Sequence, residues 1–220
     1  MNLVLITSVI NISNNPLSYT STRSVYTREE RYLDTKKTIE SIKKYIPNNR
    51  ILLVECSILS EEENKYLEEN VDFYLNLCNK ENIVKMTTSL SKSMGEGIMT
   101  IEAIKYMKEH NINYGNLFKI SGRYWLNQNF NYELYNNNKI CIHRIQNDYH
   151  NIATYLYKLP QIKVDEWYQF LSKSFEDFEN CVGYEVIFGK FINSLIDDKI
   201  EIEKVGINGY ISVSRDFLDV

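Results

Sequence analysis

A short segment in the middle of the chain concentrates the side chains best suited to chemistry. Lys119, Ser121 and Arg123 occupy alternate positions within the sequence NLFKISGRYWL, which runs from Asn116 to Leu126. In an extended strand, alternate residues share one face, so the ammonium, the hydroxyl and the guanidinium would lie together. An interior strand rarely holds two cations without partners, because burial of an unpaired charge is unfavourable. The segment therefore predicts a strand edge that binds an anion.

The first strand and the loop after it are expected to lie near such a site. Leu3–Ile10 is a continuous apolar run with Thr7 and Ser8 toward its end, the pattern of a central parallel strand. Residues 11–27 are polar, contain turn-forming Asn and Pro, and show no periodicity. Loops of this length inside compact domains are usually functional.

Helices and strands then follow in alternation. A capping box at Thr27 and Glu30 opens the next helix, and Ser60 precedes three glutamates that open another. Alternating strands and helices at this spacing predict a parallel sheet with right-handed crossovers. The elements expected before the Lys119 strand are a helix over 28–45, a strand over 51–55, a helix over 61–70, a strand over 71–77 and a helix over 97–110.

The C-terminal part of the chain is expected to be partly antiparallel. The expected elements are paired strands over 139–145 and 152–159 about a polar turn at Asn147–Asp148, helices over 164–179 and 184–195, and two short strands within 200–213 about a turn at Asn208–Gly209. No internal repeat, low-complexity tail or linker interrupts the sequence, so residues 1–220 are expected to form a single domain.

Composition excludes several classes of protein. The formal net charge is −4 and no basic stripe is present, which disfavours binding to nucleic acid or anionic membranes and means that any anion site must be local. The four cysteines have no CxxC spacing, so neither a zinc cluster nor a disulfide framework is predicted and a reducing, intracellular compartment is expected. The first apolar run is too short for a signal peptide or a membrane span. Seventeen tyrosines, many asparagines and few glycines are typical of an AT-rich genome, although tyrosine is also suited to stacking on sugars and bases, and composition does not separate these two causes.

The order of elements resembles that of the nucleotide-sugar glycosyltransferases of the GT-A superfamily. The likeness covers roughly the first 130 residues and implies an α/β fold of GT-A type, with a mostly parallel central sheet flanked by helices and a small antiparallel C-terminal part. Residues 1–130 would form the nucleotide-sugar-binding half and residues 131–220 the acceptor-side half of a cytoplasmic protein, in the host cytoplasm if the protein is viral. The segments that are similar to a small group of viral and bacterial glycosyltransferase-like proteins are Leu17–Tyr19, Arg23–Thr27, Glu30–Arg31, Thr38–Ile42 and Lys119–Tyr124.

The resemblance also implies a metal site that the sequence does not provide. In GT-A enzymes the helix matching 97–110 leads to a strand that ends in Asp-x-Asp, whose carboxylates hold Mn²⁺ or Mg²⁺ against the donor diphosphate. Here that strand ends in Ser-Gly-Arg, and no Asp-x-Asp occurs in the chain. A divalent metal is therefore doubtful and no metal ligand is predicted. We expect Arg123, helped by Lys119, Lys92 or Arg23, to neutralise the diphosphate instead.

The superfamily holds its nucleotide at the positions that match Thr7, Ser8, Tyr19 and Arg23. The resemblance implies that Tyr19 stacks on the base and that Arg23 reaches a phosphate. Alternatively, the tyrosine covers the sheet edge and the arginine is solvated. Glu55, at the end of the second strand, would accept a hydrogen bond from the base or ribose, or would pair with a nearby lysine.

A glycine-containing segment before the helix over 97–110 offers a second anion contact. The residues expected to form a loop, whose backbone N–H groups face an anion together with the helix dipole, are Lys92, Ser93, Gly95, Glu96 and Gly97. The spacing is not that of a P-loop, since no Gly-Lys-Ser/Thr follows the glycines. With Ser121, these residues complete the predicted donor site.

An inverting transfer would need a carboxylate that deprotonates the acceptor hydroxyl. Glu185, near a helix start, is the candidate by its position in the chain, and Asp148 and His150 are the alternatives. A helix N-terminus also favours glutamate for electrostatic reasons alone, so Glu185 has a structural explanation as well.

Two functions follow from these observations. The first is a glycosyltransferase that moves a hexosyl or deoxyhexosyl group from a nucleotide-diphosphate donor to a carbohydrate or glycoprotein acceptor. The alternative is a catalytically inactive GT-A module that binds a nucleotide or a glycan. A methyltransferase is disfavoured because the glycine-rich turn expected after the first strand is absent. The sequence leaves open which sugar and acceptor are used, whether the configuration is retained or inverted, and the oligomeric state.

Overall fold

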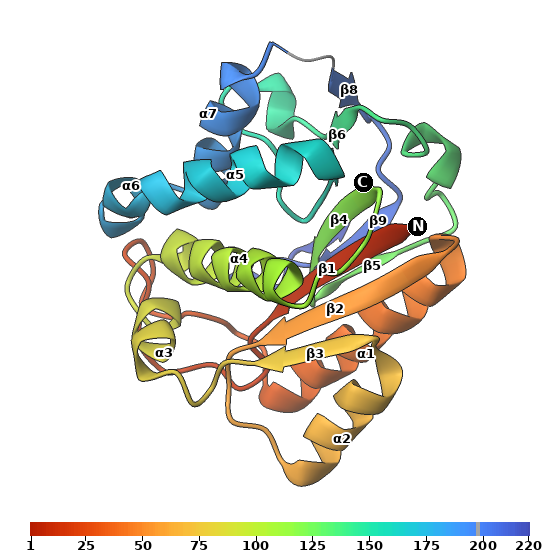
Figure 1. Cartoon of the computed structure of the whole chain (residues 1–220). Helices are drawn as coiled ribbons and strands as arrows, with labels where there is room; N and C mark the ends of the chain where they lie inside the picture. Colours follow the sequence, from red (N-terminus) through yellow and green to blue (C-terminus); the bar gives the residue numbers. More distant parts are fainter. Residues whose placement is uncertain (197–198) are drawn as a thin grey trace.

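Seven strands form a central sheet in the order β3-β2-β1-β4-β7-β6-β8 (Figure 1). The computed structural model describes residues 1–196 and 199–220. The first four strands are parallel, β7 is antiparallel to both β4 and β6, and β8 is parallel to β6. The strands are β1 (Asn2–Ser8), β2 (Asn49–Glu55), β3 (Phe73–Asn76), β4 (Asn116–Ser121), β6 (Ile140–Ile142), β7 (Leu156–Pro160) and β8 (Lys199–Glu201).

Helices cover both faces of this sheet, because β1 is apolar on both sides. Leu3 and Leu5 pack into the core on the side of α4, whereas Val4 and Ile6 pack into the core on the side of α1. On the first side lie α3 (Glu81–Thr87), α4 (Lys92–Glu109), α5 (Gln161–Lys173), α6 (Phe175–Glu179) and α7 (Tyr184–Ser194), and on the second lie α1 (Arg28–Tyr45) and α2 (Glu61–Asn70). Two single-turn 3-10 helices are η1 (Tyr132–Leu134) and η2 (Ile145–Asn147).

A second, smaller sheet lies against α1. Its antiparallel strands, in the order β10-β9-β5, are β5 (Tyr124–Leu126), β9 (Ile207–Tyr210) and β10 (Phe217–Asp219). Hydroxyl groups of α1 fasten it: Thr38 Oγ1 donates to the carbonyl oxygen of Tyr124 at 2.7 Å, and Ser41 Oγ accepts from the N–H of Leu126 at 3.0 Å. The predicted fold class, a mostly parallel sheet with a small antiparallel part, is therefore confirmed.

Local sequence signals account for the starts of two helices. Thr27 and Glu30 cap α1 reciprocally, since each side chain accepts a hydrogen bond from the backbone N–H of the other. Ser60 and Glu63 do the same at the start of α2. Both predicted capping boxes are confirmed, and each satisfies N–H groups that the first turn of a helix leaves without partners.

The predicted strand from Asn116 to Leu126 is wrong in one respect. It breaks after Ser121, and the chain continues through Gly122 and Arg123 into β5 of the small sheet. The backbone turns here because the N–H of Arg123 bonds to the carbonyl oxygen of Ser121 at 2.8 Å, outside either strand ladder. Arg123 therefore lies at the junction of the two sheets.

The predicted glycine-containing loop before α4 is also wrong. The helix begins at Lys92, so Gly95, Glu96 and Gly97 belong to it. A Cβ atom on Gly97 would lie 2.3 Å from Cζ of Phe178, so a glycine is needed for the close packing of α4 on α6. Gly97 therefore serves helix packing and does not interrupt α4.

The C-terminal predictions are partly correct. The antiparallel pair β6 and β7 is confirmed, but it is shorter than predicted, and the helix expected over 164–179 divides at Ser174 into α5 and α6. Asn208 and Gly209 lie inside β9 and not at a turn; the hairpin turn to β10 falls at 211–216. The short helix α3 was not predicted.

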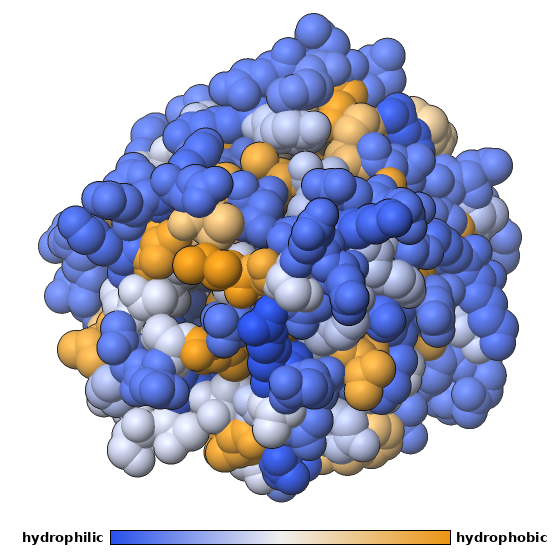
Figure 2. All heavy atoms as spheres, turned by 90° about the horizontal axis from the view of Figure 1, so that it is seen from below, coloured by the Kyte–Doolittle hydropathy of each residue, from blue (hydrophilic) through white to orange (hydrophobic). Residues whose placement is uncertain are grey.

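The surface is mixed in polarity. Figure 2 shows one face on which hydrophilic side chains predominate and hydrophobic ones appear in separate groups. Among the described residues, no helix is both long and apolar enough to cross a membrane.

Candidate anion-binding site

A cavity opens where the carboxyl ends of β1 and β4 lie side by side. Thr7 at the end of β1 pairs with Ser121 at the end of β4, and the chain connections diverge here, since β2 lies on the other side of β1. Open α/β sheets bind ligands at such switch points. The cavity has a volume of about 90 Å³, and its lining comprises Thr7, Val9, Ile12, Arg23, Arg31, Thr87, Lys92, Gly95, Glu96, Met99, Ser121, Arg123 and Ser212.

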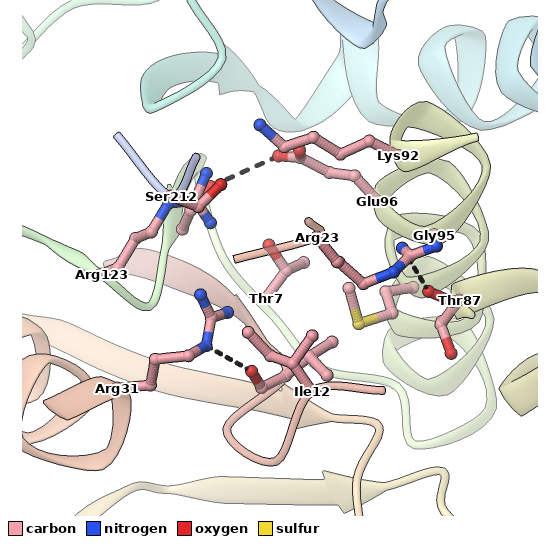
Figure 3. A pocket seen from close by; sticks show the side chains of 13 residues that line it. Thr7, Ile12, Arg23, Arg31, Thr87, Lys92, Gly95, Glu96, Arg123 and Ser212 are labelled. Atoms are coloured by element: carbon pink, nitrogen blue, oxygen red, sulfur yellow. Dashed lines mark hydrogen bonds between the residues drawn. The ribbon is translucent and has the colours of Figure 1, made fainter. Parts of the chain in front are cut away.

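Four cationic side chains reach this cavity from four different parts of the fold. Arg23 comes from the loop after β1, Arg31 from α1, Lys92 from the first turn of α4 and Arg123 from the junction of the sheets (Figure 3). Among the described lining residues, Glu96 alone carries a carboxylate. The cavity is therefore strongly positive.

Arg123 has a buried hydrogen-bond donor that no described group satisfies. Its Nε atom is buried and has no hydrogen-bond partner, and its guanidinium forms no ion pair with any residue that the structure describes. Its guanidinium carbon lies 5.0 Å from the ring centroid of Tyr124. A buried donor without a partner is unfavourable, and an anion bound in the cavity would remove that penalty.

Arg31 lies close enough to Arg123 for the two charges to repel. Its Nε donates to the carbonyl oxygen of Val9 at 2.7 Å, and no described carboxylate pairs with it. Burial, and then the charge of Arg123, lowers the pKa of Arg31 to about 9, so the guanidinium stays protonated at neutral pH. Two neighbouring guanidinium groups that both lack an acid form a natural receptor for a phosphate group.

Lys92 adds a third cation without an ion-pair partner among the described residues. Its amine makes no hydrogen bond or ion pair with the described part of the chain, and it lies across the cavity from Arg31 (Figure 3). Burial and the charge of Arg123 lower the pKa of Lys92 from its ordinary value. As the first residue of α4, Lys92 also stands at the positive end of a helix dipole.

Glu96, the one carboxylate among the described lining residues, is neutralised by Lys119 of β4. Lys119 is fully buried, and its amine bonds to Glu96 Oε1, to Ser121 Oγ at 3.1 Å and to the carbonyl oxygen of Thr154 at 3.2 Å. Burial alone would raise the pKa of Glu96, but Lys119 outweighs it and holds that pKa below its ordinary value. All three amine hydrogens of Lys119 have acceptors inside the protein, so Lys119 has no hydrogen left to donate to a bound anion.

Arg23 lines the cavity but serves mainly as a tether. Its guanidinium donates to the carbonyl oxygens of Asn15 at 3.2 Å, Pro16 at 3.4 Å and Thr87 at 3.1 Å, and also to that of Ser89. These bonds fasten the loop after β1 to the segment between α3 and α4. Most of the donor capacity predicted to meet a phosphate is therefore used by the backbone.

Glu55 is also a structural residue. Its side chain is fully buried and accepts hydrogen bonds from the N–H groups of Ile10 and Cys56 and from Ser57 Oγ at 2.6 Å. Burial raises the pKa of the carboxyl group, although these bonds oppose the shift. Glu55 does not line the cavity; it holds the end of β2 to the start of the loop after β1.

The remaining predicted residues divide between the cavity and its surroundings. Thr7, Gly95 and Ser121 line the cavity, whereas Ser8 lies on the α1 side, where its Oγ is 3.3 Å from Oγ1 of Thr35. Thr35 in turn donates to the carbonyl oxygen of Gly122 at 2.9 Å. Thr7 of β1 and Ser121 of β4 thus lie together at the cavity with Gly95 of α4, and Ser8 supports the turn that carries Arg123.

A second hollow of about 210 Å³ adjoins the cavity and shares Lys92 and Glu96 with it. Tyr19, which is exposed, and Glu185, in the first turn of α7, both line it. Thr154 Oγ1 donates to Glu185 Oε1 at 3.0 Å, which orients the carboxylate.

The alternative acid, Asp148, lies elsewhere. It stands on an exposed turn after η2 and lines neither the cavity nor the second hollow. Its Oδ1 accepts from the N–H of His150 at 2.9 Å, which makes it part of the turn. The position of Asp148 therefore gives no support to a catalytic role, and the same holds for His150.

Sequence reasoning missed Arg31, Thr87 and Ser212 as lining residues. Arg31 carried a usable signal, because Arg31, Thr35 and Thr38 recur at helical spacing on the face of α1 that meets Gly122 and the start of β5. Ser212 comes from the hairpin turn between β9 and β10, far away in the sequence, and no local pattern indicates its position.

The lining residues do not fit a divalent metal ion. Mn²⁺ and Mg²⁺ need several oxygen ligands, with carboxylates foremost, whereas this cavity offers one carboxylate that is already paired with Lys119. Among the described residues, no group of three or more His, Cys, Asp or Glu side chains could hold a metal ion. The donor set suits an anion.

We expect the Glu96–Lys119 pair to be important for stability. Glu96→Gln should lower the free energy of unfolding by about 3–5 kcal/mol, because it leaves the buried ammonium of Lys119 uncompensated. Glu102→Gln is the matched control; its lysine partners are half-exposed, so it should cost only about 1 kcal/mol or less. Urea unfolding of both variants measures the difference, and equal losses would contradict the buried-pair assignment.

Comparison with solved structures shows which fold this is. The galactosyltransferase LgtC, solved with donor and acceptor sugar analogs, is 10% identical and has a TM-score of 0.51; the match covers 88% of this chain and 69% of that chain. An active-site mutant of LgtC is also 10% identical and has a TM-score of 0.58; the match covers 98% of this chain and 89% of that chain. The glycosyltransferase GlyE of Streptococcus pneumoniae TIGR4 has 0.53 at 12% identity over 92% of this chain and 45% of that chain. A nucleoside-diphosphate-sugar pyrophosphorylase of Vibrio cholerae RC9 has 0.53 at 8% identity over 92% and 93%. No protein-family model and no curated protein matches the sequence. The chain adopts a GT-A-type fold.

Proposed function

We propose that the protein is a glycosyltransferase that moves a hexosyl or deoxyhexosyl group from a nucleoside-diphosphate donor to a carbohydrate or glycoprotein acceptor. The observation that carries the proposal is the cluster of Arg31, Lys92 and Arg123, none of which pairs with a described carboxylate, at the switch point of the sheet. The names of the solved structures with this fold support the same substrate class, since they include glycosyltransferases and a nucleoside-diphosphate-sugar enzyme.

The cation cluster would stabilise the leaving group. In the transfer, the bond between the anomeric carbon of the sugar and the diphosphate oxygen breaks, and negative charge grows on that oxygen. Arg31 and Arg123 can each offer two parallel N–H donors to phosphate oxygens, and Lys92 supplies a point charge across the cavity. Fixed donors aimed at developing charge lower the barrier, so in this proposal the side chains do the work of a metal ion.

The second hollow would hold the reacting sugar and the acceptor hydroxyl. Glu185 lines it and would accept the proton of the acceptor hydroxyl as the new glycosidic bond forms. Thr154 binds Oε1 of Glu185, and no described group bonds to Oε2, which leaves that atom for the acceptor. Tyr19 would cover the same hollow from outside.

A further hollow gives room for the base of the nucleotide. It has a volume of about 240 Å³, adjoins the cavity through Val9, Ile12, Arg23 and Thr87, and reaches the carboxyl end of β2 at Cys56. The diphosphate in the first cavity would therefore connect a base on one side to a sugar on the other.

Arg123→Ala and Arg31→Ala should each weaken the binding of nucleoside diphosphates by about 10-fold or more, because each removes a charged hydrogen-bonding partner worth about 1.5–3 kcal/mol. Isothermal titration calorimetry with UDP, GDP, ADP and CDP measures the effect. Arg50→Ala, at the opposite end of β2, is the control and should bind as the unaltered protein does. Unchanged affinity in the Arg123 variant, or its unfolding, would show that Arg123 has a structural role instead.

A panel of nucleotide sugars should release nucleoside diphosphate in the presence of EDTA and a carbohydrate acceptor. Glu185→Gln should abolish most of this turnover while the affinity for the nucleoside diphosphate stays the same, because the change removes the base and leaves the phosphate site intact. Release that EDTA stops and Mn²⁺ restores would refute the metal-free arrangement. Binding without turnover for every donor would instead identify an inactive binding module.

The affinity for nucleoside diphosphate should fall as pH rises from neutral to alkaline values. The lowered pKa of Lys92 means that its positive charge is lost at a lower pH than that of an ordinary lysine, and a neutral amine attracts a diphosphate less. Lys92→Arg should make this fall smaller, since a guanidinium keeps its charge to a higher pH than an amine. The fall that remains is expected from Arg31, whose pKa is lowered to about 9. An identical pH profile for the two proteins would exclude Lys92 from the site.

A further inference from the structure

The small sheet displays three aromatic rings on its outer face. Trp125 of β5, Tyr210 of β9 and Phe217 of β10 lie in a row, with ring centroids 6.0 Å apart between Trp125 and Tyr210 and 5.1 Å apart between Tyr210 and Phe217. Phe217 is 52% exposed, and the other two rings are half-buried. We call Trp125, Tyr210 and Phe217 the aromatic face. Exposed rings gathered in this way usually mark a binding surface.

Polar groups share this face with the rings. Strand pairing sets Asn208 opposite Trp125 and Asp219 opposite Asn208, so the amide and the carboxylate stand on the same side of the small sheet as the aromatic rings. Asp219 is exposed and forms no ion pair with a described residue, although Asn127 donates to its Oδ1 at 3.3 Å. The amine of Lys37 lies 4.7 Å from the ring centroid of Trp125.

We propose that the aromatic face binds a carbohydrate chain. The C–H groups on one side of a sugar ring carry partial positive charge and can stack on the negative face of an aromatic ring, while the hydroxyl groups at its edge need amides and carboxylates as partners. The aromatic face offers the rings, and Asn208 and Asp219 beside it offer the amide and the carboxylate. A protein partner would instead favour a centre depleted of charge, and the opposite charges of Lys37 and Asp219 disfavour a polyanion.

The aromatic face leads directly to the cavity. Arg123, two residues before Trp125, and Ser212, two residues after Tyr210, both line the cavity. The carbonyl oxygen of Ser212 accepts from the N–H of Val25 at 2.8 Å, which holds the hairpin turn against the loop after β1. A chain of sugar units on the aromatic face would therefore extend toward the cavity. Resting on the proposed transferase function, we assign this face to the acceptor, an oligosaccharide of several units.

Tryptophan fluorescence tests the proposal directly, because the two tryptophans differ in exposure. Trp167 is fully buried in the core, so a bound carbohydrate can change the emission of Trp125 alone. Tetrasaccharides of the cello, malto, chito and lacto-N series serve as probes, titrated without any nucleotide. We expect at least one to change the emission saturably, with a dissociation constant in the range of about 1 mM, and Trp125→Phe to abolish the signal.

Phe217→Ala should weaken that binding about fivefold or more, because it removes an exposed ring without opening the core. Tyr149→Ala, which removes an exposed ring elsewhere, is the matched control and should bind normally. Absence of a signal with all four tetrasaccharides, or equal binding by the Phe217 variant, would overturn the proposal. So would concentration-dependent dimerisation that Phe217→Ala abolishes.

The two proposals can fail separately. Calorimetry with nucleoside diphosphates, run on the same Phe217→Ala protein, should give unchanged affinity because Phe217 does not line the cavity. Normal diphosphate binding with no carbohydrate binding would overturn the aromatic face alone. Carbohydrate binding with no diphosphate binding would overturn the transferase and leave a glycan-binding protein.

Discussion

The ion pair between Glu96 and Lys119 determines the character of the site. It joins α4 to the central strand β4, and through the carbonyl oxygen of Thr154 it also reaches the segment before β7. Because Glu96, the one carboxylate among the described lining residues, pairs with Lys119, the cations Arg31, Lys92 and Arg123 have no described ion-pair partner in the cavity. A buried pair of this kind contributes little net stability, yet loss of either partner is severe, so the pair fixes how α4 and β4 fit together.

The same arrangement explains why cations can collect at one point in an acidic protein. Each comes from a separate element, so its backbone is held by contacts remote from the cavity: Arg31 by α1, Lys92 by α4 and Arg123 by the junction between the sheets. Folding forces the three charges together at an energetic penalty, which other parts of the core offset. Sites of this kind, with strained electrostatics, are characteristic of binding and catalysis.

The sequence predicted those features that depend on neighbours in the chain. Capping boxes located α1 and α2, and the apolar run located β1. Alternation correctly put Lys119 and Ser121 on one face of β4. It could not reveal that Lys119 faces Glu96 of a helix, because pairing across the fold has no local signature and Gly95 and Gly97 suggested a loop. Ser212 escaped notice for the same reason, since tertiary packing alone brings it to the cavity. Arg31 was missed although its helical spacing with Thr35 and Thr38 indicated the face of α1 on which it lies.

The tether formed by Arg23 has a consequence for how a ligand arrives. An unattached loop of this length would have to lose about 1–2 kcal/mol of conformational entropy per residue before it could contact a ligand. Here the loop loses this entropy during folding. Its order comes from the four carbonyl oxygens that accept from the Arg23 guanidinium, from Glu55 at its start and from Ser212 near its end. A ligand therefore meets a loop that is already ordered, and the rate of ligand binding depends on diffusion and charge attraction more than on rearrangement of the chain.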